Sequence, residues 1–201
     1  MYASLLMLIL LPFVTYGMGG HAGEGNLLLK LELLNLFLIV TGLVVIGIFI
    51  NTYRNSHLGA VFVLFFTATL LFGLTRMFYL AAYVGMLNVS DNTLNVGWHA
   101  VFFAGIIMFY IAARKLVDLA SGSASKSSFA QALGISAVGL LFAVVLFIIA
   151  APIDAWFSSV FDGTWMDTFG IQHFIAFLLS GFAAFEMYRV RSRLGKNIAS
   201  I

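Results

Sequence analysis

The stretch AQALGISAVGLLFAVVLFIIA, residues 130–150, contains 21 consecutive residues without a charged side chain. A helix rises about 1.5 Å per residue, so this stretch is long enough to cross the hydrocarbon core of a bilayer, which is about 30 Å thick. Four further apolar stretches lie at residues 31–50, 58–76, 94–113 and 169–188. The sequence therefore predicts an all-α, polytopic integral membrane helix bundle with about five transmembrane helices.

The composition of the chain supports this class of protein and excludes several others. Of its 201 residues, 62% are hydrophobic and 9% are charged, whereas soluble domains are about 45–50% apolar and about 25% charged. Because cysteine is absent, disulfides, iron–sulfur clusters and thiolate zinc sites are excluded. The formal net charge is only +2 and the basic residues form no run, so we expect no nucleic-acid partner.

The first 20 residues precede the five spans and form a separate segment. Their apolar run, MYASLLMLILLPFVTYG, is shorter than a typical span and has the length of a signal-peptide core. The basic residues that usually open a signal peptide are missing, which leaves an uncleaved N-terminal anchor as the alternative. We therefore divide the chain into a signal peptide or anchor at residues 1–20 and a single five-helix transmembrane domain at residues 21–201.

The distribution of lysine and arginine predicts the orientation in the membrane, because basic loops stay on the cytoplasmic side. Eight basic residues follow the first, third or fifth span, and only Lys30 and Arg76 fall on the other side. This bias predicts a multi-pass protein of the plasma membrane. Its N-terminus lies outside after signal removal, and its C-terminus is cytoplasmic. The eight residues are Arg54, Arg114, Lys115, Lys126, Arg189, Arg191, Arg193 and Lys196.

Two histidines occupy matching positions in two of the spans. His99 lies five residues into the span at 94–113 and His173 four residues into the span at 169–188, and both spans run inward from the outer face. Two imidazoles at one depth are the ligands of a bis-histidine haem b, and they also suit copper or iron. The alternative is a pair of interfacial histidines that do not face one another. His21, in GGHAGEG, is either a further metal ligand or a solvated histidine.

Arg76 is an arginine with apolar residues on both sides, near the outer end of the second span. A cation in this position needs a carboxylate, a cofactor acid or an anionic lipid. If haem is present, Arg76 is the natural partner of a propionate. The alternative is an interfacial arginine paired with Asp91 or Asp167.

Glu186 lies near the inner end of the fifth span, 13 residues beyond His173. An intramembrane carboxylate is a candidate for one step of a proton path. Its spacing to two following arginines, Arg189 and Arg193, favours a simpler interpretation, an ion pair on the surface of one helix.

These features predict a small integral membrane subunit of a larger complex. The complex is expected to be a redox or metal-dependent enzyme, with His99, His173 and Arg76 binding haem b and the three histidines available to a metal. The alternatives are a structural subunit without a cofactor and, third, a membrane sensory module. Partners are expected to be other membrane protein subunits and the lipid bilayer, and we predict no catalytic residue in the chain itself.

Overall fold

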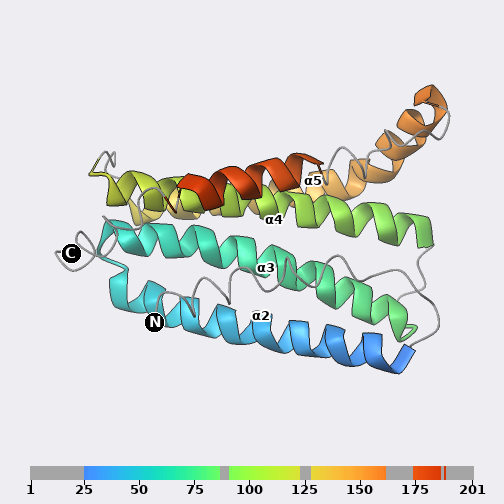
Figure 1. Ribbon diagram of the computed structural model, residues 1–201, viewed down its shortest axis with the longest axis horizontal. Coiled ribbons are helices and arrows are strands. Elements are labelled where there is room, and N and C mark those ends of the chain that lie inside the picture. Colours follow the sequence, from blue (N-terminus) through green and yellow to red (C-terminus); the bar gives the residue numbers. More distant parts are fainter. Residues whose placement is uncertain (1–24, 87–90, 123–127, 162–173, 187, 189–201) are drawn as a thin grey trace.

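The computed structural model describes residues 25–86, 91–122, 128–161, 174–186 and 188, and all its regular structure there is helical. The helices run back and forth along one long axis (Figure 1). This confirms the all-α bundle. The helices are α2 (Gly25–Tyr53), α3 (His57–Tyr83), α4 (Asp91–Ala120), α5 (Phe129–Phe161) and a shorter helix, Phe174–Glu186.

Four of these helices are long and apolar enough to cross a membrane. They contain four of the five predicted spans. The fifth predicted span, 169–188, is described as a helix only over Phe174–Glu186, since residues 169–173 and 187 lie outside the described residues. Residues 1–20 also lie outside them. The apolar segments of the four helices are Glu32–Tyr53, His57–Ala82, Val96–Ala120 and Phe129–Ile153.

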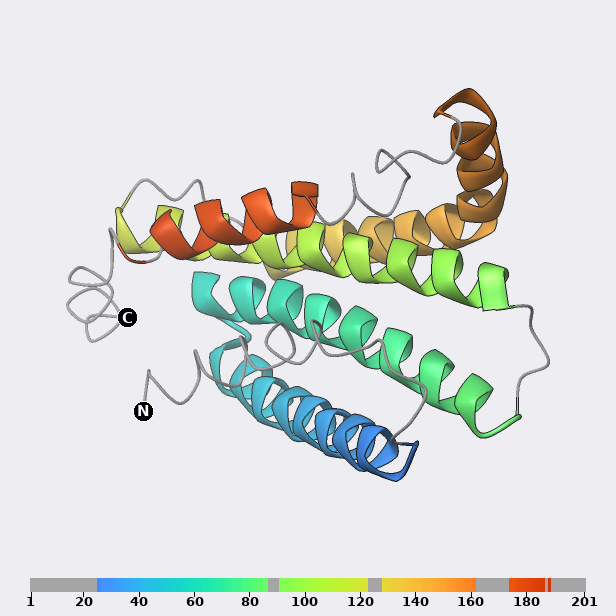
Figure 2. The same cartoon turned by 45° about the vertical axis from the view of Figure 1, so that its right-hand side comes forward.

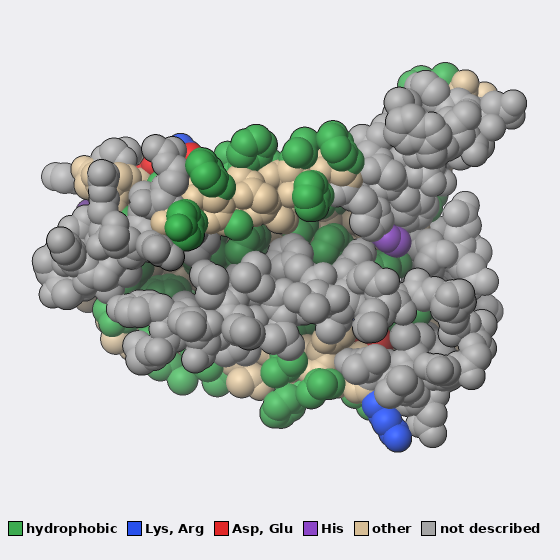
Figure 3. All heavy atoms as spheres, viewed as in Figure 1, with side chains coloured by type: hydrophobic (Ala, Val, Ile, Leu, Met, Phe, Trp, Pro, Cys, Tyr) green, Lys and Arg blue, Asp and Glu red, His purple; other side chains and the backbone are tan. Residues whose placement is uncertain are grey.

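Two helices form the centre of the bundle and two lie at its sides. In an 18-residue apolar stretch of each helix, the buried share is 72% for α3 and 67% for α4, against 17% for α2 and 22% for α5. Helix α2 packs on α3, and α5 packs on both α4 and α3. The outer helices therefore expose apolar side chains that need lipid or another protein to cover them. Figure 3 shows exposed apolar side chains over α2 and over the helix Phe174–Glu186.

Small residues allow α3 and α4 to approach closely. Ala68 and Ala112 are fully buried in the core. A Cβ added to Gly105 of α4 would lie 2.6 Å from ring carbon Cε1 of Phe72 on α3. The Phe72 ring in turn packs 5.2 Å from the ring of Phe102, measured between centroids. This packing is typical of membrane helices, in which small residues bring backbones together.

A tight turn joins α2 to α3. Ser56 caps α3, because its hydroxyl accepts a hydrogen bond of 3.4 Å from the N–H of Gly59. A side chain at Gly59 would collide with the carbonyl group of Tyr53. The turn therefore requires glycine at this position and sets α2 and α3 antiparallel.

Candidate functional site

The antiparallel course of the helices brings the start of α2, the end of α3 and the start of α4 to one end of the bundle (Figures 1 and 2). We call this the α3–α4 end. The opposite end holds the turn between α2 and α3, and we call it the α2–α3 end. Five residues lie about one to two turns from the ends of their helices at the α3–α4 end. They are Glu32 of α2, Arg76 and Tyr79 of α3, and Trp98 and His99 of α4.

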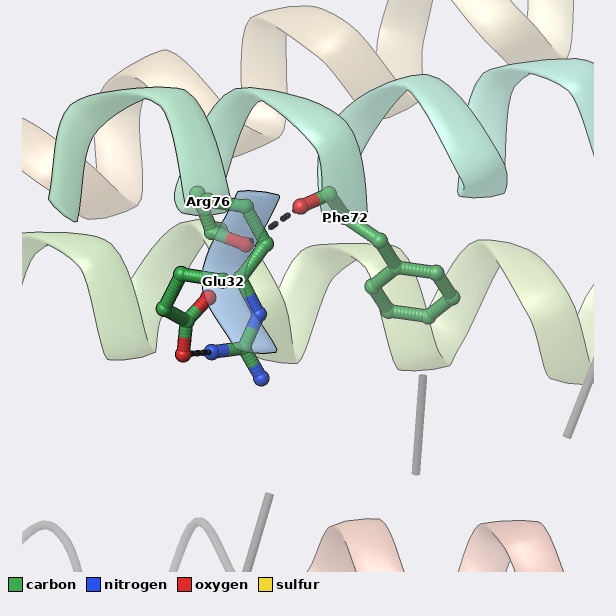
Figure 4. Close-up of polar contacts among 4 residues, drawn as sticks. Glu32, Phe72 and Arg76 are labelled. Carbon is green, nitrogen blue, oxygen red and sulfur yellow. Dashed lines mark hydrogen bonds and ion pairs between the residues drawn. The ribbon is translucent and has the colours of Figure 1, made fainter. Parts of the chain in front are cut away.

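A buried ion pair joins α2 to α3 at this end. Nη1 of Arg76 donates a hydrogen bond of 2.7 Å to Oε1 of Glu32, and the two side chains are only 9% and 10% exposed (Figure 4). Arg76 thus has the carboxylate that its apolar surroundings require. From the sequence, the expected partner was a haem propionate or, as the alternative, Asp91 or Asp167. The side chain of Asp91 and the whole of Asp167 lie outside the described residues, so that pairing stays a prediction.

The second carboxylate oxygen of Glu32 gives the ion pair an open acceptor. Among the described residues, Oε2 of Glu32 is buried and accepts no hydrogen bond. A buried carboxylate oxygen without a donor costs free energy, because it has lost its water. This oxygen is an acceptor for a water molecule or for the donor group of a ligand.

Trp98 connects the ion pair to His99. The guanidinium carbon of Arg76 lies 5.9 Å from the centroid of the Trp98 ring, which is within reach of a cation–π interaction. The ring of Tyr79 lies 6.0 Å from the same indole, and the imidazole of His99 lies 4.2 Å from it. A buried cation, its acid and three aromatic rings therefore form one cluster at the α3–α4 end.

His99 is half-buried, and it is the one predicted histidine ligand that the structure describes. His173 and His21 both lie outside the described residues, so the predicted histidine pair is not tested. No group of three histidine, aspartate or glutamate side chains that could hold a metal occurs among the described residues. His99 and Arg76 both contact Trp98, and the binding of a cofactor by these two residues stays a prediction.

A second ion pair fixes the last described helix against α4. Nη1 of Arg114 lies 3.4 Å from Oε1 of Glu186, and the side chains are 43% and 24% exposed. Ala183 of this helix is buried in the core. The sequence interpretation paired Glu186 with Arg189 and Arg193 on its own helix. Those arginines lie outside the described residues, and the partner that the structure adds is on another helix.

Glu32 is the charged residue of the cluster that was not predicted from the sequence as a site residue. Its signal was present, because an acid at the start of the first span faces the same side of the membrane as Arg76 in the second span. Comparisons with protein-family models, with curated proteins and with solved structures find no match to this chain. What is established is the class of protein, a helical membrane protein.

Proposed function

We propose that the chain is a small integral membrane subunit of a larger redox or metal-dependent complex, in which His99 and His173 ligate haem b or a metal ion near the outer face. Imidazole is a ligand for haem iron, copper and iron alike. The proposal needs the two imidazoles to lie at one depth, on helices that are neighbours.

The Arg114–Glu186 ion pair is the observation that carries this proposal. Both helices run in the same direction along the bundle, with their earlier residues toward the α3–α4 end (Figures 1 and 2). His99 precedes Arg114 by 114 − 99 = 15 residues, and His173 precedes Glu186 by 186 − 173 = 13 residues. We propose that the last helix extends back by one residue, from Phe174 to His173. At about 1.5 Å per residue, the two histidines would then lie about 20 Å from the ion pair and within about 3 Å of one depth.

The charge distribution supports an orientation with the α3–α4 end outside. Arg54, Arg114 and Lys115 belong to the α2–α3 end, where basic residues favour the cytoplasm. We therefore propose a plasma-membrane protein whose histidine site lies in the outer leaflet. Arg76 is already neutralised by Glu32, so a haem propionate beside it would compete with that carboxylate or share the guanidinium with it.

An optical spectrum with metal analysis tests the proposal on the chain isolated with its partners from native membranes. We expect a Soret band, or stoichiometric copper or iron, in the wild-type protein. His99→Ala and His173→Ala should each remove it. His57→Ala is the matched control, because His57 is an exposed histidine at the opposite end of the bundle. Absence of both haem and metal from the wild-type complex would reject the histidine site.

A structural subunit without its own cofactor is the second candidate. It is favoured by the outer helices α2 and α5, which are little buried within the chain and carry exposed apolar side chains that offer two broad faces to a partner. Gentle extraction tests it independently of cofactor content. A structural subunit should co-purify at fixed stoichiometry with another membrane protein, whereas a stable lone monomer would argue against any complex.

A further inference from the structure

Helix α5 continues beyond the part that is needed to cross the membrane. Its apolar segment, Phe129–Ile153, has 25 residues and is about 37 Å long, which already exceeds the hydrocarbon core of about 30 Å. The helix nevertheless extends to Phe161. Near its carboxyl end it turns sharply away from the other helices, at the α3–α4 end (Figures 1 and 2).

Pro152 accounts for the change of direction. It lies inside α5, where it has no N–H to donate and where its ring crowds the carbonyl group four residues earlier. Sharp bends in helices occur mostly at proline. The position of Pro152 at the end of the apolar segment therefore places the bend where the helix leaves the hydrocarbon core. We call the residues that follow the bend, 153–161, the α5 arm.

The α5 arm carries an exposed apolar stripe. Ile153, Trp156 and Val160 are 40%, 60% and 54% exposed. At about 100° per residue they fall within a sector of about 60° around the helix. The stripe continues back along α5 through Ile149 and Val145, which are also exposed. It is therefore continuous with the apolar surface that α5 presents to the bilayer.

We propose that the α5 arm binds the lipid–water interface of the same bilayer, with Trp156 as its anchor at headgroup level. The spacing of the stripe gives the arm one apolar side, as in helices that lie in the interface plane. Tryptophan prefers this region because its ring is largely apolar while its N–H needs a polar partner. The arm fixes the depth in the membrane of the α3–α4 end, where the aromatic cluster lies.

Spin labels on single cysteines test this proposal in the full chain, because the natural sequence contains no cysteine. Trp156→Cys is labelled in the protein reconstituted in vesicles of phosphatidylcholine and phosphatidylglycerol. Two further positions serve as controls. Ile148→Cys reports the apolar surface of α5 within the hydrocarbon core, and Ala155→Cys reports the other side of the arm. Collision with oxygen and with a water-soluble nickel chelate gives the depth of each label.

We expect the three labels to lie at different depths in the bilayer. The label at position 148 should be deepest, the label at 156 should lie at headgroup level, and the label at 155 should be the most accessible to the nickel chelate. A label at 156 that is as water-accessible as the label at 155 would overturn the proposal. Shielding of position 156 from both reagents would also overturn it, since it would show contact with a second copy of the chain.

Replacement of a tryptophan anchor by a label could itself displace the arm, so unlabelled protein provides a second measurement. The variant with Trp98→Phe and Trp165→Phe keeps Trp156 as the only tryptophan, since the chain has three. Lipids brominated near the headgroup should quench its emission more strongly than lipids brominated near the bilayer centre. Emission that neither lipid quenches would overturn the proposal in the same way.

Discussion

Arg76 and Glu32 meet across 2.7 Å between α3 and α2, and both side chains are nine-tenths buried. They are 44 residues apart in the chain. Taking both charges out of water costs several kcal/mol per ion, and their attraction compensates for this cost only while both are present. The free-energy cost of breaking the ion pair is therefore larger than its net contribution to stability. This cost holds α2 against the side of α3.

Substitution of either partner should destabilise the protein strongly. We expect Glu32→Ala or Arg76→Ala to lower the free energy of unfolding in detergent micelles by about 3–5 kcal/mol, because each leaves one buried charge uncompensated. The double variant Glu32→Met with Arg76→Met should lose less than the sum of the two single changes. Lys30→Ala is the control, since Lys30 is exposed two residues from Glu32 and should change stability little. Single variants as stable as Lys30→Ala would show that the pair is not buried.

Gly105→Ala should disturb the contact between α3 and α4. The added methyl group would lie 2.6 Å from the Phe72 ring, so we expect a loss of about 1–3 kcal/mol, measured by thermal unfolding in the same micelles. Gly47→Ala is a matched control, because a Cβ at Gly47 meets nothing within 4 Å. That change should be neutral or stabilising by up to about 1 kcal/mol. If both alanine variants behave alike, the close approach at Gly105 does not occur.

The contact between Arg76 and Trp98 should appear as a coupling free energy. A double-mutant cycle of Arg76→Met and Trp98→Leu isolates it from the separate cost of each change. At a distance of 5.9 Å we expect a coupling of about 0.5–2 kcal/mol. The same cycle run with Trp156→Leu should give no coupling, since Trp156 is exposed and lies on the α5 arm. Equal coupling in the two cycles would contradict the cluster.

The Arg114–Glu186 pair should matter more for helix placement than for stability. Because both side chains are partly exposed, removing one should cost only about 0–1 kcal/mol. Arg114→Glu places two acids together, and we expect it to loosen the last helix and increase cleavage by protease. The charge exchange Arg114→Glu with Glu186→Arg should restore resistance to cleavage. Failure of the exchange to restore it would show that the two side chains do not meet.

The sequence by itself determined the class of fold and the approximate length of the helices. Runs without charge, such as residues 130–150, are long enough to cross a bilayer, and backbone hydrogen bonds in lipid can be satisfied only within helices or closed barrels. The sequence also predicted that Arg76 has an anionic partner, because an unpaired cation in apolar surroundings is costly. The position of His99 within its span gives an expected depth in the membrane, which stays a prediction.

Only the tertiary structure decided which residues meet. Helical periodicity gives the face of a side chain but not the neighbouring helix that the face contacts, so Glu32 could not be chosen from several acids as the partner of Arg76. The same holds for Arg114 and Glu186, whose contact sets the register of two helices. Membrane helices pack through shape and a few polar contacts rather than through a hydrophobic pattern, because lipid is as apolar as their side chains. The choice of partners therefore depends on close approaches such as that between Gly105 and Phe72, which appear only when the helices are assembled.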